Sequence, residues 1–315
     1  MKVMWRTIGL SLAILAGSSV LIAQSNRSRY AVLELSRPGS LDSVAFGINS
    51  LGHVVGTDQG QAFLYDGRTI RYLGTLGGAA SEGYGINSSG DVIGASFYIP
   101  GNGTRHAFLY RDGWMQDLGT LPGAQGESYA SGINDQGQVI GFSSTAAGDF
   151  SYRAFIYTAA DGMRQLGLPG VGNWATAINS AEQITGQTAL VLGGGQAFVY
   201  SGGNTLLLGT LGGNQSWGNA INDQGWVVGG STLSGPNPYA YHAFLYRDGR
   251  LTDLDQRNMP LDGTADSEAR AINVSGQIVG QFYKNLEPHA FVYSGGSMCD
   301  LNDLIPASSC PGACK

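Results

Sequence analysis

The chain has 315 residues, a net charge of −6 and only 13% charged residues. This charge balance argues against nucleic acid and anionic membrane surfaces as partners. Glycine is unusually common: it makes up 50 of the 315 residues, about 16%, against about 7% in average proteins. Because 43% of the residues are hydrophobic and 10% are aromatic, the composition excludes intrinsic disorder.

Residues 1–23 have the pattern of a secretory signal peptide. Lys2 and Arg6 give a positive start, residues 8–20 are apolar, and Ala23 offers a small residue to a signal peptidase. The alternative is an uncleaved anchor, although the apolar run is short for a bilayer span. We therefore expect a secreted, extracellular or periplasmic protein with no membrane span after signal removal.

A sixfold repeat fills residues 24–304. Each copy begins with Ile-Asn and a short turn, continues through a Val/Ile-rich run that usually ends in Gly, and later carries Ala-Phe-x-Tyr. A period near 45 residues that contains several short strands is typical of repeat architectures. The six Asn residues are separated by 38 to 51 positions: Asn49, Asn87, Asn134, Asn179, Asn222 and Asn273.

The turns between these strands have recognisable chemistry. Asn-x-x-Gly predicts a turn capped by the Asn side chain with a left-handed Gly at its fourth position. Glu182 replaces that Gly in the fourth copy, so we expect its turn to be strained or differently built. Asp-Gly or Gly-Gly after Ala-Phe-x-Tyr predicts a hairpin into a fourth strand.

Four antiparallel strands in each repeat predict an all-β fold, a β-propeller of about six four-stranded blades. A stacked β-solenoid is the alternative, but its coils are usually shorter. Residues 30–35 repeat the fourth-strand pattern a seventh time and would complete the last blade as a terminal strand. Alternatively, residues 298–315 begin a seventh blade that remains unfinished.

Residues 305–315 form a cysteine-containing tail. Cys310 and Cys314 would close a small disulfide loop in an oxidising compartment, or Cys299 would pair with either of them. We expect no cofactor and no metal. The repeat histidines would each occupy a separate blade, too far apart to share one ion: His106, His242 and His289.

Three copies carry His-Ala-Phe-aliphatic-Tyr, at residues 106–110, 242–246 and 289–293. Linked segments read Asp-Leu-Gly-Thr-Leu at 117–121 and Gly-Ile-Asn-Asp-Gln-Gly at 132–137. In these motifs the chain resembles the HAF extracellular repeat family over about residues 30–304. The resemblance implies a bacterial, secreted or surface-associated protein and implies no reaction. The other three copies replace the motif histidine by Gln61, Arg153 and Gln196.

One position varies in type within this regular frame and is the predicted ligand-binding position. It lies five residues before each Asn and holds Val44, Glu82, Tyr129, Trp174, Trp217 and Glu268. Variable residues on a rigid repeat scaffold often bind ligands, although ordinary packing of the tryptophans is the alternative. The Ser or Asn before this position is interpreted as turn support. Aromatic residues in three long loops (residues 95–105, 142–152 and 230–241), among them Tyr239 and Tyr241, extend the candidate site.

No nucleophile, metal-protease or phosphate-loop motif occurs in the sequence, so we assign no catalytic residue. We expect a non-catalytic binding or structural module whose partner is a glycan or a surface protein. The alternative is a carbohydrate-active hydrolase or lyase in the mouth of the propeller. It would need two converging carboxyl groups among Glu82, Glu127 and Glu268.

Overall fold

The structure is a computed structural model that describes residues 33, 35, 40, 42–98, 103–124, 126–145, 151–190, 194–256 and 266–304. These residues form 24 strands and one short 3-10 helix, Leu301–Asp303. None of their helices is long and apolar enough to cross a membrane. The predicted signal peptide and the tail with Cys310 and Cys314 lie outside the described residues, whereas Cys299 is described, is exposed and is a free thiol.

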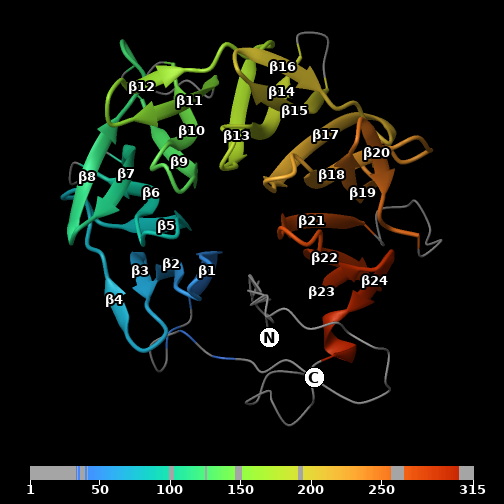
Figure 1. Ribbon diagram of the computed structural model, residues 1–315, viewed down its shortest axis with the longest axis horizontal. Coiled ribbons are helices and arrows are strands. Elements are labelled where there is room, and N and C mark those ends of the chain that lie inside the picture. Colours follow the sequence, from blue (N-terminus) through green and yellow to red (C-terminus); the bar gives the residue numbers. More distant parts are fainter. Residues whose placement is uncertain are drawn as a thin grey trace, which may run out of the picture. The chain divides into compact units, whose positions relative to one another are not determined.

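The first unit, Leu35–Gln165, contains three antiparallel four-stranded sheets, each in simple meander order (Figure 1). The strands are β1 Ser43–Ile48, β2 Val54–Asp58, β3 Gln61–Tyr65 and β4 Ile70–Tyr72; β5 Ser81–Ile86, β6 Val92–Phe97, β7 Arg105–Arg111 and β8 Trp114–Gly119; β9 Ser128–Ile133, β10 Val139–Ser144, β11 Tyr152–Thr158 and β12 Gly162–Gln165. Strand β5 packs on β1, β2 and β3, and β9 packs on β5, β6 and β7. The first strand of each sheet therefore lies against the sheet before it.

The second unit, Leu166–Lys315, contains three more four-stranded meanders, and a single parallel pairing of Gly195 with Gln215 joins the first two of them into one eight-stranded sheet (Figure 1). Its strands are β13 Gly172–Ile178, β14 Ile184–Ala189, β15 Gly195–Ser201 and β16 Asn204–Leu207; β17 Gly212–Ile221, β18 Val227–Leu233, β19 Tyr241–Arg247 and β20 Arg250–Asp253; β21 Ser267–Ile272, β22 Ile278–Lys284, β23 Glu287–Ser294 and β24 Ser297–Asp300. Strand β17 packs on β13, β14 and β15, and β21 packs on β17, β18 and β19.

Stacked four-stranded meanders are the blades of a β-propeller, so the predicted fold class is confirmed. The described residues contain six blades, three in each unit, which we number 1 to 6 in chain order. Most of residues 30–35 lie outside the described part, and Leu33 and Leu35 are not in a strand, so the terminal strand stays a prediction. After β24 the chain enters the 3-10 helix rather than a further strand.

The third strand of each blade carries the core, as its Ala-Phe-x-Tyr pattern predicts. Its phenylalanine is completely buried in every blade: Phe63, Phe108, Phe155, Phe198, Phe244 and Phe291. Each of these strands lies between two neighbours in its sheet, and Phe108, Phe155, Phe244 and Phe291 also pack in clusters with buried residues of the preceding blade. Continuous apolar runs are expected for strands that are buried on both faces.

The Gly that ends the second-strand motif is required by a close approach of backbone. A Cβ atom on Gly94 would lie 1.9 Å from the carbonyl oxygen of Glu82 and 2.8 Å from the ring of Phe108. The first strand bulges at this point, between Gly83 and Gly85, and so bends toward β6. The equivalent glycines would meet a first-strand carbonyl oxygen at 1.9 to 2.1 Å: Gly56, Gly141, Gly186, Gly229 and Gly280.

The Asn of each Ile-Asn pair caps its own turn and also links neighbouring blades. The Oδ1 atom of Asn87 accepts the backbone N–H groups of Ser89 and Asp91, as the turn motif predicts. Its Nδ2 donates to the backbone carbonyl of Asn134, the corresponding Asn of the next blade, at 3.3 Å. The same inter-blade bond joins Asn49 to Asn87, Asn179 to Asn222 and Asn222 to Asn273.

The turn in the fourth blade is strained rather than differently built. Glu182 has φ of 58° and occupies the left-handed position that Gly90 holds at 86° in blade 2. Its N–H still donates to the carbonyl of Asn179, so the turn keeps the shape of the others. A side chain in this conformation costs about 1–2 kcal/mol. The predicted Asp-Gly hairpins are present too, with positive φ at both Asp112 and Gly113.

A buried ion pair fixes the Asn turn of blade 2. Arg111 donates to the two carboxylate oxygens of Asp91 at 2.8 and 2.7 Å, and Asn87 donates to the same carboxylate at 3.0 Å. Asp91 is 7% exposed. The Arg111 guanidinium, assisted by Asn87 and opposed by burial, holds the pKa of Asp91 below its usual value of 3.8.

We expect Asp91→Asn to lower the free energy of unfolding at pH 7 by about 1 kcal/mol. The expected loss is small because Arg111 is half-exposed and water screens its charge. A lowered pKa in the folded state gives stability that is present above the unfolded value of 3.8 and is lost as the pH falls through the folded value. The difference in free energy of unfolding between wild type and variant should therefore become smaller below about pH 4. Urea unfolding from pH 7 to 2.5 measures it. Asp248→Asn, at the exposed pair with Arg247, is the control and should show no such difference; a constant difference down to pH 2.5 would contradict the assignment.

Candidate functional site

The motif histidines are structural partners of an aspartate in the same blade. His106 Nδ1 lies 3.0 Å from the Asp117 carboxylate, and the equivalent distances are 2.8 Å for His242 and Asp253 and 2.6 Å for His289 and Asp300. Burial raises the pKa of Asp117, but hydrogen bonds from His106 and from the Gly119 N–H outweigh burial and leave that pKa below its usual value.

The histidine and its aspartate are present or absent together. In the three blades with a motif histidine, the fourth-strand residue opposite the buried Phe is an aspartate: Asp117, Asp253 or Asp300. In the three blades where Gln61, Arg153 or Gln196 replaces the histidine, that residue is Tyr72, Gln165 or Leu207, respectively. This covariation within one chain indicates strand pairing rather than catalysis. Within the described residues, no group of three His, Cys, Asp or Glu side chains is placed to hold a metal ion.

The predicted ligand-binding residues occupy one structural position, which we call the first-strand row. Each pairs with the second strand at the same register, and together they lie near the beginning of strands β1, β5, β9, β13, β17 and β21. The row consists of Val44, Glu82, Tyr129, Trp174, Trp217 and Glu268. The residue two positions later stands at the bulge of the first strand and also lies beside the row, since Tyr84 bonds to Glu82 and Arg270 pairs with Glu268. This adjacent row consists of Phe46, Tyr84, Ser131, Thr176, Asn219 and Arg270.

The serine before the first-strand row links blades instead of supporting its own turn. Ser81 Oγ accepts the N–H of Ala62 at 3.0 Å and donates to the carbonyl of Gly74 at 2.6 Å, both in the preceding blade. Ser128 and Ser216 make the same pair of bonds. The sequence interpretation as a satisfier of backbone groups is right, but those groups belong to another blade. These bonds hold the first-strand row rigidly in place.

In blade 2, Glu82 is engaged by two donors. It accepts the hydroxyl of Tyr84, and Arg105 at the start of β7 lies 3.3 Å from its other carboxylate oxygen. Burial and the bond to Glu82 raise the pKa of Tyr84 well above its ordinary value. The Arg105 guanidinium also lies 4.6 Å from the ring centre of Phe97. About a quarter of the Glu82 and Arg105 side chains remains exposed.

In blade 3, Tyr129 donates to Glu127 at 2.9 Å and stacks on Phe142 with ring centres 5.2 Å apart. Tyr152 meets the edge of Phe142 at 5.3 Å. Burial and the bond to Glu127 raise the pKa of Tyr129, and the Arg105 charge opposes this rise. The Arg105 charge of blade 2 thus acts on Tyr129 of blade 3. We call the residues of these two groups the blade 2–3 cluster: Glu82, Tyr84, Arg105, Glu127, Tyr129, Phe142 and Tyr152.

In blades 5 and 6, the row forms a closed inter-blade clamp. Glu268 accepts the indole N–H of Trp217 at 2.7 Å and the amide of Asn219 at 2.8 Å, and pairs with Arg270 at 2.8 Å. Glu268 is only 7% exposed. Tyr241 meets the Trp217 ring edge-on at 5.4 Å, and burial, with Asp266 and Glu268, raises the pKa of Tyr241 to about 12.

The remaining candidates are Trp174 and Tyr239. Trp174 lies on β13 beside Gly172, where an added Cβ would come 2.9 Å from its ring. Tyr239 is 80% exposed in the turn before β19. The predicted long loops are shorter than expected because the second and third strands extend into them. As a result Phe97, Phe142, Tyr152 and Tyr241 lie on strands, and Phe150 lies outside the described residues.

Sequence reasoning missed four residues that complete these sites, namely Tyr84, Arg105, Asn219 and Arg270. Three of them belong to the adjacent row. Their signal is their constant place two residues after each variable position, where the first strand bulges. Arg105 has no such signal, because it comes from the third strand of the blade.

Comparisons with known proteins give the fold and little more. Residues 211–312 match the model of a family described as a protein of unknown function (DUF3466). No curated protein matches the chain significantly. Among solved structures, the chain resembles the β-propeller domain of the trilobed protease from Pyrococcus furiosus, at 12% identity and a TM-score of 0.53, over 84% of this chain and 83% of that one.

Two further structures show the same architecture. TolB from Acinetobacter baumannii has 12% identity and a TM-score of 0.52 over 79% of this chain, which spans 62% of TolB. A puromycin-hydrolyzing peptidase from Mycobacterium tuberculosis has 14% identity and a TM-score of 0.52 over 79% of this chain and 42% of the peptidase. At such identities these likenesses support the propeller fold alone.

Proposed function

We propose that this protein is an exported, non-catalytic binding module built from HAF-type repeats, and that its ligand is a glycan of the cell surface or its surroundings. The blade 2–3 cluster is the binding site. Its side chains come from different strands of two adjacent blades, so the propeller frame positions them before any ligand arrives. Rigid placement lowers the entropy lost on binding.

The observation that carries this proposal is the composition of the cluster. Tyr129, Phe142 and Tyr152 offer aromatic surface, while the partly exposed Glu82 and Arg105 offer a paired acceptor and donor. Aromatic residues with an apolar body and a polar tip suit the two-sided chemistry of sugars, which have apolar ring faces and hydroxyl rims.

The alternative activity, carbohydrate hydrolysis or elimination, would use Glu82, Glu127 or Glu268. General acid–base catalysis needs a carboxyl group that is free to exchange its proton with substrate. Each of the three glutamates is engaged: Glu82 by Tyr84 and Arg105, Glu127 by Tyr129, and Glu268 by three donors. This engagement favours binding over catalysis.

A glycan array probed with the full chain, together with a pull-down from the envelope of the producing cell, tests the proposal. We expect binding that falls about tenfold or more in Arg105→Ala and Tyr129→Ala, since bonds to charged groups and aromatic contacts contribute about that much. Arg164→Ala, an exposed change on β12 of blade 3, is the matched control. Absence of binding to any glycan would contradict the proposal; release of sugar from a bound glycan would favour the enzyme, and capture of an envelope protein alone would favour a protein partner.

A further inference from the structure

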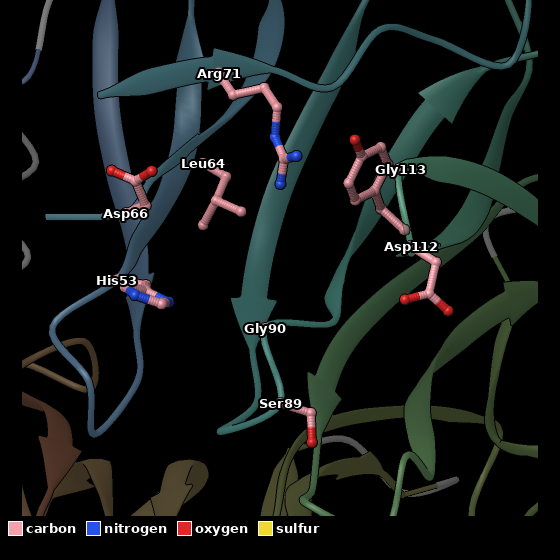
Figure 2. Close-up of a pocket in the computed structure, with 9 residues that line it drawn as sticks. His53, Leu64, Asp66, Arg71, Ser89, Gly90, Asp112 and Gly113 are labelled. Atoms are coloured by element: carbon pink, nitrogen blue, oxygen red, sulfur yellow. The ribbon is translucent and has the colours of Figure 1, made fainter. Parts of the chain in front are cut away.

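A cavity of about 420 Å³ lies between blades 1 and 2, at the turn end of the strands and away from the blade 2–3 cluster. It is lined by His53, Leu64, Asp66, Arg71, Ser89, Gly90, Tyr110, Asp112 and Gly113. Figure 2 shows side chains from both blades facing this space, with the Arg71 guanidinium reaching in above Leu64. The volume is within the range of small-ligand sites in proteins.

The repeat itself shows that this cavity is an exception. At three junctions between blades within the two units, the Gly of the Asn turn faces a side chain of the preceding blade. A Cβ on Gly137 would lie 2.9 Å from Arg111, one on Gly225 would lie 3.0 Å from Gln183, and one on Gly276 would lie 2.8 Å from Trp226. The corresponding Gly90, at the junction of blades 1 and 2, has nothing within 4 Å.

Of the four junctions that lie within the two units, three are therefore filled by a side chain and one is open. Where Trp226 and Gln183 fill their junctions, the equivalent residue of blade 1 is His53, four positions after the turn Asn. His53 leaves the space empty. The open junction therefore leaves room for a ligand that the other junctions exclude.

Two cationic or donating groups face the cavity without a charged partner. Within the described residues, the Arg71 guanidinium makes no hydrogen bond or ion pair and lies 5.6 Å from the centre of the Tyr110 ring. The imidazole of His53 likewise has no side-chain partner among those residues. An arginine in this state is suited to a planar carboxylate, which it can bind through two parallel hydrogen bonds.

The other lining groups restrict the ligand further. Asp66 and Asp112 bring two carboxylates to the rim, and they would repel a ligand that is anionic throughout. Asp66 already accepts the N–H groups of Arg68 and Thr69 and the Thr69 hydroxyl, which leaves one of its roughly four acceptor positions for a ligand hydroxyl. The buried Leu64 and Tyr110 provide an apolar floor. The ligand should therefore carry one carboxylate, several hydroxyls and an apolar face.

We propose that the cavity between blades 1 and 2 binds an acidic sugar residue, with the sugar carboxylate on Arg71 and His53 and sugar hydroxyls on Asp66 and Asp112. This site is separate from the blade 2–3 cluster and does not depend on the function proposed for it. A free uronic acid and an acidic residue within a polysaccharide share this chemistry.

Isothermal titration of the full chain with galacturonate, with a neutral galactose oligosaccharide that carries a single galacturonate residue, and with the neutral sugar galactose tests the proposal. We expect both acidic sugars to bind and galactose to bind at least tenfold more weakly; tighter binding of the oligosaccharide than of free galacturonate would indicate a polysaccharide as the source of the ligand. Arg71→Gln should weaken acidic sugars tenfold or more. His53→Trp, which would fill the junction as Trp226 does, should abolish binding.

Two control variants show whether binding depends on this cavity in particular. Arg68→Gln changes an exposed cation on the same hairpin that does not line the cavity, and it should leave binding unchanged; so should Arg164→Ala, an exposed change on β12 that lines neither site. Equal losses in Arg68→Gln and Arg71→Gln, equal affinity for galactose, or equal affinity for inorganic sulfate would overturn the proposal. So would normal acidic-sugar binding by a folded His53→Trp variant.

Discussion

Gly94→Ala is expected to destabilise the protein by about 4 kcal/mol or more, although it adds a single methyl group. The new Cβ would lie 1.9 Å from the Glu82 carbonyl oxygen and 2.8 Å from the Phe108 ring. Phe108 has no room to move, because it is fully buried among the packed strands of the blade. Strand β5 would therefore have to separate from β6, which would break the pairing of the strand that carries Glu82 and Tyr84.

Urea unfolding followed by circular dichroism measures this loss. Gly167→Ala is the matched control, because it is the same substitution at an exposed glycine whose added Cβ would meet nothing within 4 Å. Its free energy of unfolding should stay within about 0.5 kcal/mol of wild type. If the two variants lose the same stability, close backbone approach is not what demands glycine at the end of the second strand.

The repeated residues made the fold predictable because each has a local cause. The Asp-Gly pair specifies a hairpin, Ala-Phe-x-Tyr specifies a strand buried on both faces, and Glu182 signals a strained Asn turn in the fourth copy. The repeat length then leaves few architectures besides a propeller. The spacing alone did not show that Asn87 reaches Asn134 in the next blade, because a period says nothing about which atoms of two copies meet.

The candidate site was only half predictable for the same reason. Glu82 and Trp217 stand out because they vary within a regular frame. Their partners do not stand out in the sequence. Arg105 comes from the third strand, and Glu268 bonds to Trp217 of the preceding blade, 51 residues earlier in the chain. The open junction at Gly90 was invisible in the sequence, because an empty space depends on how far the His53 side chain of another blade extends.

Glu268→Ala is expected to destabilise the second unit by about 2–4 kcal/mol. It removes the common acceptor of the Trp217 indole and the Asn219 amide; the partly buried indole N–H is left unpaired, whereas Asn219 keeps its bond to the Ala269 carbonyl. The exposed Arg270 adds little, because water solvates its charge once the partner is gone. Glu268→Gln keeps an amide oxygen in the acceptor position and should lose less than about 1.5 kcal/mol.

The order of these variants separates a clamp from a reactive acid. Glu287→Ala, an exposed change on β23 of the same blade, should leave stability unchanged. If Glu268 joins blades 5 and 6 through hydrogen bonds, the free energy of unfolding should decrease from wild type to Glu268→Gln and further to Glu268→Ala. Trp217 fluorescence should change in parallel, because the indole loses its hydrogen-bond partner. If Glu268 instead served as a catalytic acid, both variants would fold as wild type does, with an unchanged Trp217 signal. That outcome would make Glu268 a candidate catalytic residue again.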